Sequence, residues 1–149
     1  MKSHRFLISG AETTGKERLY MYSCGKPITV VAILRLVESG KLSLEDKVCD
    51  YLPEMKNAFI INENGEKEYV GDTMTIQHLF TMTAGFTHDI YKEPVLKLIK
   101  ESQGKATLRE FIAKFIESPL AFKPGDQYKY GINHDVLAAV CEVIVGKRF

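Results

Sequence analysis

The apolar segment from Pro27 to Ser39 constrains the fold of this 149-residue chain more than any other feature. Pro27 suits the first turn of a helix, and Gly40 suits the position just after its last turn. A helix that is apolar all round is normally buried, so the segment predicts the central helix of the domain. Its apolar residues are Ile28, Val30, Val31, Ala32, Ile33, Leu34, Leu36 and Val37.

Ser23 and Lys26 stand three residues apart at the expected start of this helix. Positions i and i+3 share one helix face, so the lysine amine can reach the serine hydroxyl. The partial positive charge at a helix N-terminus favours an alkoxide-like serine, and a neutral amine can act as the general base. The same spacing also fits a helix-capping serine beside a solvated lysine, so spacing alone leaves both interpretations open.

Composition limits the classes of partner. Apolar residues make up 45% and charged residues 26% of the chain, as in ordinary globular domains, and its length fits a single domain over residues 1–149. The net charge is +1 with the two signs interspersed, which argues against nucleic-acid or anionic membrane partners. No apolar run reaches membrane-spanning length, and the first residues do not form a signal peptide. We therefore expect a cytoplasmic chain, unless an export segment preceded it.

Cysteines and histidines show no metal-site spacing. Cys24, Cys49 and Cys141 are odd in number and lack a C-x-x-C pair, which argues against a disulfide framework or a zinc site and predicts buried, reduced thiols. Cys24 is an alternative nucleophile beside Ser23, but no nearby histidine would activate it. The histidines are predicted to be surface or capping residues: His4, His78, His88 and His134.

The remaining pattern predicts a mainly α chain with one small β-hairpin. Asn64-Gly65 lies between the apolar pairs of two short strands and favours a tight hairpin turn. A capping box of Thr107 and Glu110 begins one helix, and Gly146 suits the end of the last. Helices are expected over about residues 94–102, 107–118 and 135–145, with shorter ones near 48–52 and 75–85.

Four segments, in this order, resemble the serine β-lactamase and penicillin-binding-protein superfamily, in its class C β-lactamase-like branch with esterases and D-aminopeptidases. The second, Val-Cys-Asp-Tyr-Leu-Pro-Glu-Met, is similar to that branch's V-x-x-Y-L-P-E-F. The resemblance covers about residues 20–149, and it implies the helical domain of an α+β fold with most of the antiparallel sheet absent. The segments are Ser23–Asp46, Val48–Met55, Met74–Phe86 and Phe122–Gly146.

The resemblance also implies roles for individual residues. Ser23 matches the acylated nucleophile, Lys26 its base partner, and Tyr130 the tyrosine that moves protons between the serine and the leaving group. It implies a serine hydrolase that acts through an acyl-enzyme on amide, ester or β-lactam substrates. The expected partner is then a small-molecule or peptide substrate, with no metal or organic cofactor.

Two local departures from the family pattern affect the site. Cys24-Gly25 replaces a small residue and threonine before the lysine. Ile132 occupies the position of the family's asparagine two residues after the tyrosine, and Asn133 follows one residue later. The sequence leaves two roles open for Asn133, which are contact with a substrate amide and capping of the last helix.

The family's third motif, a Lys- or His-x-Gly triad on a strand, does not follow Tyr130 in this sequence. Lys123-Pro124-Gly125 matches the Lys-x-Gly pattern but lies in the turn before Tyr130. Loss of one oxyanion donor typically costs about a hundred- to a thousandfold in rate, so we expect an N-terminal piece that is weak or inactive alone. The alternative is a truncated or degenerate domain that binds a ligand or partner without turnover. Apolar helix surface left without its sheet predicts self-association.

Overall fold

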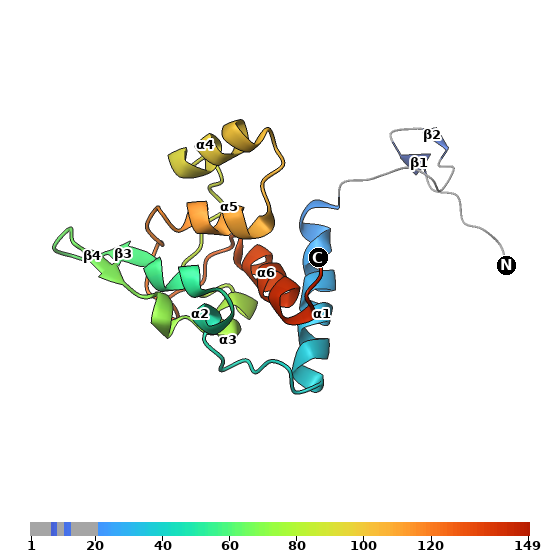
Figure 1. Cartoon of the computed structure of the whole chain (residues 1–149), viewed down its shortest axis with the longest axis horizontal. Coiled ribbons are helices and arrows are strands. Elements are labelled where there is room, and N and C mark those ends of the chain that lie inside the picture. Colours follow the sequence, from blue (N-terminus) through green and yellow to red (C-terminus); the bar gives the residue numbers. More distant parts are fainter. Residues whose placement is uncertain (1–6, 9–10, 13–20) are drawn as a thin grey trace.

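The computed structural model describes residues 7–8, 11–12 and 21–149 (Figure 1). Leu7–Ile8 (β1) pairs antiparallel with Ala11–Glu12 (β2). From residue 21 onward the named secondary-structure elements are helices apart from one hairpin, which confirms the predicted mainly α fold class. Within the described ranges, no helix has both the length and the apolar character needed to span a membrane.

Helix α6 (Asn133–Val145) is the central element of the fold. It lies between α1 (Lys26–Glu38) and the helices α3 (Ile76–Phe80) and α5 (Leu108–Phe115), and it contacts all three (Figure 1). Most of its residues are buried, although its first three are polar. The core that surrounds it includes Ile33, Leu79, Ile112, Phe115, Leu137 and Val140.

The prediction that α1 is buried on every side was wrong. Its inner face contributes Thr29, Ile33 and Leu36 to the packing against α6. Its outer face carries Ile28, Val31 and Leu34, whose exposed fractions are 55%, 58% and 42%. We call these three residues the α1 apolar stripe. The apolar pattern was read correctly, but no described residue covers the outer face, so α1 lies at the edge of the molecule.

The remaining elements follow the expected order. The hairpin turns at Gly65, whose φ of 78° is accessible mainly to glycine. Thr107 and Glu110 form the predicted capping box, and Gly146 ends α6 with a φ of 70°. The other elements are α2 (Val48–Tyr51), η2 (Pro53–Asn57), β3 (Phe59–Ile61), β4 (Lys67–Tyr69), η3 (Gly71–Thr73) and α4 (Glu93–Ser102).

We propose that the α1 apolar stripe mediates self-association of the 149-residue chain. A carboxylate on this stripe should oppose association, because a charge placed in an apolar contact loses its solvation. We therefore expect Val31→Glu to weaken association by at least about tenfold, or roughly 1.4 kcal/mol, in concentration-dependent sedimentation.

Leu96→Glu on α4 is the matched control, since Leu96 is an exposed apolar residue of another helix with 46% exposure. It should sediment like the parent chain. Monomeric behaviour of the parent at high concentration, or dissociation by Leu96→Glu instead, contradicts the assignment.

Candidate active site

Ser23, Lys26 and Tyr130 lie together at the surface end of α1, and we call them the Ser23 cluster. The Lys26 Nζ donates a hydrogen bond to Ser23 Oγ at 3.4 Å. The Tyr130 hydroxyl donates to the same oxygen at 2.5 Å, across 107 residues of sequence. The structure thus brings together the three residues that the sequence singled out, while their chemical roles remain proposals.

A short 3-10 helix, η1 (Tyr22–Gly25), presents Ser23 and runs directly into α1. Tyr22 has a φ of 47°, which is uncommon for a bulky residue and costs conformational energy. This backbone turn immediately before Ser23 directs the chain into the helix. Lys26 then begins α1, and its amide N–H bonds to the Ser23 carbonyl, which fixes the spacing of the pair.

The surroundings of Tyr130 favour its ionised form. Its hydrogen bond with Ser23, followed by the interaction with Lys26, lowers the pKa of Tyr130 below its ordinary value. The Lys26 Nζ lies 5.0 Å from the centre of the tyrosine ring. Desolvation and the negative charge of Asp135 act in the opposite direction but do not prevail. A phenolate here could accept a proton from Ser23.

Gly131 allows Tyr130 to reach the cluster. A Cβ at Gly131 would lie 2.4 Å from the Phe86 carbonyl oxygen, so only glycine fits without displacing backbone. Next to it, the amide of Ile132 donates to the Thr87 carbonyl at 3.3 Å. This close approach attaches the segment that carries Tyr130 to residues 86–87, and thereby sets the position of the phenol.

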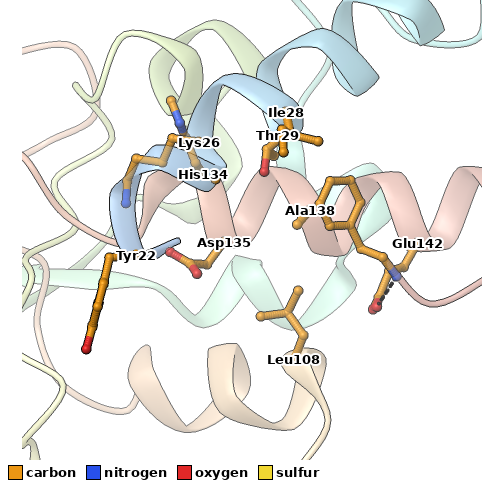
Figure 2. A pocket seen from close by; sticks show the side chains of 11 residues that line it. Tyr22, Lys26, Ile28, Thr29, Leu108, His134, Asp135, Ala138 and Glu142 are labelled. Carbon is orange, nitrogen blue, oxygen red and sulfur yellow. Dashed lines mark hydrogen bonds between the residues drawn. The ribbon is translucent and has the colours of Figure 1, made fainter. Parts of the chain in front are cut away.

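Two hollows adjoin the Ser23 cluster. One, of about 390 Å³, is lined by Lys26 of α1, Asp135 of α6 and Leu108 of α5 (Figure 2). There, burial raises the pKa of the Asp135 carboxyl, while the positive charge of Lys26 opposes the shift. The other, of about 450 Å³, is lined by Tyr130 and His88, whose ring centres are 5.9 Å apart.

Asn133 does not cap α6. The predicted capping role of Asn133 is therefore wrong. Ile132 occupies the N-cap position and makes no side-chain cap hydrogen bond, whereas Asn133 is the first helical residue. Asn133 is fully buried, and within the described part of the chain neither its Nδ2 nor its Oδ1 has a hydrogen-bond partner. Such a group typically costs about 1–3 kcal/mol. A contact with substrate stays a proposal.

The predictions for cysteines were correct for two of three positions. Cys49 and Cys141 are buried, but Cys24 is exposed in η1, where the 3-10 turn faces solvent. All three are free thiols. Within the described residues, no group of histidine, cysteine and carboxylate side chains is arranged to hold a metal ion.

The histidines have different environments. His78 caps α3, since its Nδ1 accepts from the amide of Thr75 at 3.2 Å. His134 is buried rather than exposed, and burial lowers its pKa. His88 is on the surface, as predicted, while His4 lies outside the described residues.

Sequence reasoning missed the parts of the site that depend on tertiary packing. Gly131, directly after the tyrosine, was the one available signal, because a glycine beside a functional residue often marks a close backbone approach. No motif or spacing in the sequence indicates that His88 lies beside Tyr130 or that Asp135 lies beside Lys26.

Comparisons with known proteins indicate the family to which the whole chain is similar. A family-wide sequence profile described as Beta-lactamase matches residues 7–149. Esterase EstB of Burkholderia gladioli is 33% identical over 132 residues, which cover 84% of this chain and 32% of the esterase. EstCE1, a hydrolase with promiscuous acyltransferase activity, superposes with a TM-score of 0.68 at 27% identity, covering 85% of this chain and 33% of its own.

A penicillin-binding protein from Bacillus halodurans superposes with a TM-score of 0.59 at 28% identity, covering 83% of this chain and 33% of its own. The chain therefore spans about a third of the length of the relatives described here.

The fit at Gly131 predicts that Gly131→Ala destabilises the chain and displaces Tyr130. The added Cβ would meet backbone at 2.4 and 2.8 Å, which cannot move aside as a side chain could. We expect a loss of about 1–3 kcal/mol in the free energy of unfolding, measured with urea.

Gly25→Ala is the matched control, because a Cβ there meets nothing within 4 Å and the φ of Gly25 is −74°. That variant should unfold like the parent. Equal stability of the two alanine variants would show that the Gly131 contact is not a constraint.

Proposed function

The chain belongs to the beta-lactamase family, and we propose that it is a serine hydrolase whose Ser23 forms an acyl-enzyme with ester, amide or β-lactam substrates. The observation that carries the proposal is the convergence of Lys26 and Tyr130 on the exposed Ser23 hydroxyl, at 3.4 and 2.5 Å. A capping serine does not require two proton-transfer groups, one of them 107 residues away in the sequence. The names of the relatives, an esterase and a penicillin-binding protein, agree with this class of substrate.

In the proposed first step, Ser23 Oγ attacks the acyl carbonyl carbon while its proton passes to the Tyr130 oxygen. The carbon–oxygen or carbon–nitrogen bond to the leaving group then breaks, and Tyr130 returns the proton to the departing oxygen or nitrogen. The product is an ester of Ser23. The positive end of the helix at Ser23 favours the negative charge that develops during attack.

The distances favour Tyr130 as the immediate proton acceptor. Its oxygen is 2.5 Å from Ser23 Oγ, whereas the Lys26 amine is 3.4 Å away. Lys26 also lowers the pKa of Tyr130, so we assign it the role of a base partner that stabilises the phenolate. This arrangement corresponds to general-base catalysis by a group held within hydrogen-bond reach of its proton.

In the second step, water gives a proton to Tyr130 and attacks the ester carbonyl carbon. The bond to Ser23 Oγ then breaks, Tyr130 returns the proton to Ser23 Oγ, and the acid is released. About two thirds of each relative has no counterpart in these 149 residues. We therefore expect the chain alone to be acylated but to turn over slowly. We propose full hydrolytic activity only for a chain as long as these relatives.

Acylation of Ser23 is the direct test of the proposed function. Incubation with p-nitrophenyl acetate should add one acetyl group to the chain, located on Ser23 by peptide mass spectrometry, and Ser23→Ala should remove it. Cys24→Ala is the necessary control, because the neighbouring thiol is exposed and could react by itself. An adduct that survives in Ser23→Ala and disappears in Cys24→Ala would overturn the proposal in favour of thiol chemistry.

The lowered pKa of Tyr130 predicts a pH dependence. If the phenolate is the base, the rate of Ser23 acylation rises with pH, and its midpoint lies below the ordinary tyrosine value of about 10. Lys26→Met should move the midpoint to higher pH, because the lysine is one cause of the lowered pKa.

Tyr130→Phe should remove the pH-dependent rise and slow acylation by about a hundred- to ten-thousandfold. The measurement is the single-turnover rate of nitrophenol release between pH 6 and 10. A midpoint unchanged by Tyr130→Phe rules out the phenolate as base.

A further inference from the structure

We propose that His88 is a positioning residue that holds the Tyr130 ring in place for as long as Ser23 carries the acyl group. The proposal rests on the proposed function, since it assigns a role within the same reaction. It concerns the second step, in which Tyr130 must activate water after its contact with the serine hydroxyl has been lost.

Tyr130 needs support because its side chain is 40% exposed. Three contacts with described residues bear on the position of this side chain. The hydroxyl bonds to Ser23 Oγ at 2.5 Å, the Lys26 amine lies 5.0 Å from the ring centre, and the His88 ring centre lies 5.9 Å away at an interplanar angle of 53°. Tilted aromatic pairs at such separations attract one another.

Two of these three interactions change during the reaction. After acylation, Ser23 Oγ is an ester oxygen and no longer has a hydrogen to donate to the phenolate. The Lys26 amine bonds to the same oxygen in the free protein, so its surroundings change as well. The contact with His88 involves no reacting atom and can persist through both steps.

His88 has an anchor that is independent of the Ser23 cluster. It follows Thr87, whose carbonyl accepts from the Ile132 amide at 3.3 Å and whose Oγ1 accepts from the Asp89 amide at 3.3 Å. The preceding residue, Phe86, is the backbone that Gly131 packs against. The segment bearing His88 is thus attached to the two residues that follow Tyr130, Gly131 and Ile132, and this attachment keeps imidazole and phenol together.

Fluorine NMR tests the contact without requiring turnover. The chain is labelled with 3-fluorotyrosine, and the Tyr130 signal is identified by its loss in Tyr130→Phe. His88→Ala should move this signal toward that of free 3-fluorotyrosine, whereas His88→Phe, which keeps a ring, should leave it near the parent position.

Tyr91→Ala is the matched control, because Tyr91 is an aromatic residue of the same loop with 75% exposure. It should not move the Tyr130 signal. An unchanged signal in His88→Ala, or the same shift in Tyr91→Ala, overturns the proposal.

Kinetics with excess p-nitrophenyl acetate separate the two steps. His88→Ala should retain a burst close to one equivalent, while the steady rate after the burst falls about tenfold or more through misplacement of Tyr130. His88→Phe should restore the steady rate to within about twofold of the parent.

If His88→Ala lowers the burst amplitude but leaves the steady rate unchanged, the proposed role of His88 in the second step is wrong. Absence of any Ser23 adduct in the parent chain instead rejects the proposed function, and the NMR comparison then decides by itself whether His88 holds Tyr130.

Discussion

The packing of α1 against α6 is the interaction on which the candidate site depends. Ser23 lies just before α1 and Tyr130 lies three residues before α6, so the two helices set the distance between the two hydroxyls. A slip of one helical turn would move one group by about 5.4 Å. That displacement is larger than the 3.4 Å that joins Lys26 to Ser23. The apolar contacts between these helices therefore determine whether the Ser23 cluster can form.

The site is held mainly by backbone fit. Gly131 places the tyrosine segment against the carbonyl of Phe86, and the φ of Tyr22 turns the chain into η1. The hydroxyls of Ser23 and Tyr130 themselves belong to exposed residues, as the proposed function requires. By contrast, Asn133 and His134 carry buried polar atoms that have no hydrogen-bond partner within the described residues. The fold tolerates this cost next to the site, a pattern that is common where function competes with stability.

Local chemistry made much of this structure predictable from the sequence. The capping box at Thr107, the hairpin glycine and the Ser23–Lys26 spacing depend on neighbours within a few residues, and all three features are present. Burial was harder to predict, because it depends on what covers a helix rather than on the helix alone. The mostly apolar α1 lies at the edge, while α6, which begins with three polar residues, lies at the centre. The contact between the His88 and Tyr130 rings arises from tertiary packing and cannot be predicted from residue spacing.

The 107 residues between Ser23 and Tyr130 also bear on the order of assembly during translation. The serine and its lysine leave the ribosome early, on a helix whose final packing partner has not yet been synthesised. Until α6 emerges, Ser23 has the lysine beside it but not the tyrosine. The Ser23 cluster therefore stays incomplete while these 107 residues are synthesised, and it is completed only when the core closes around α6.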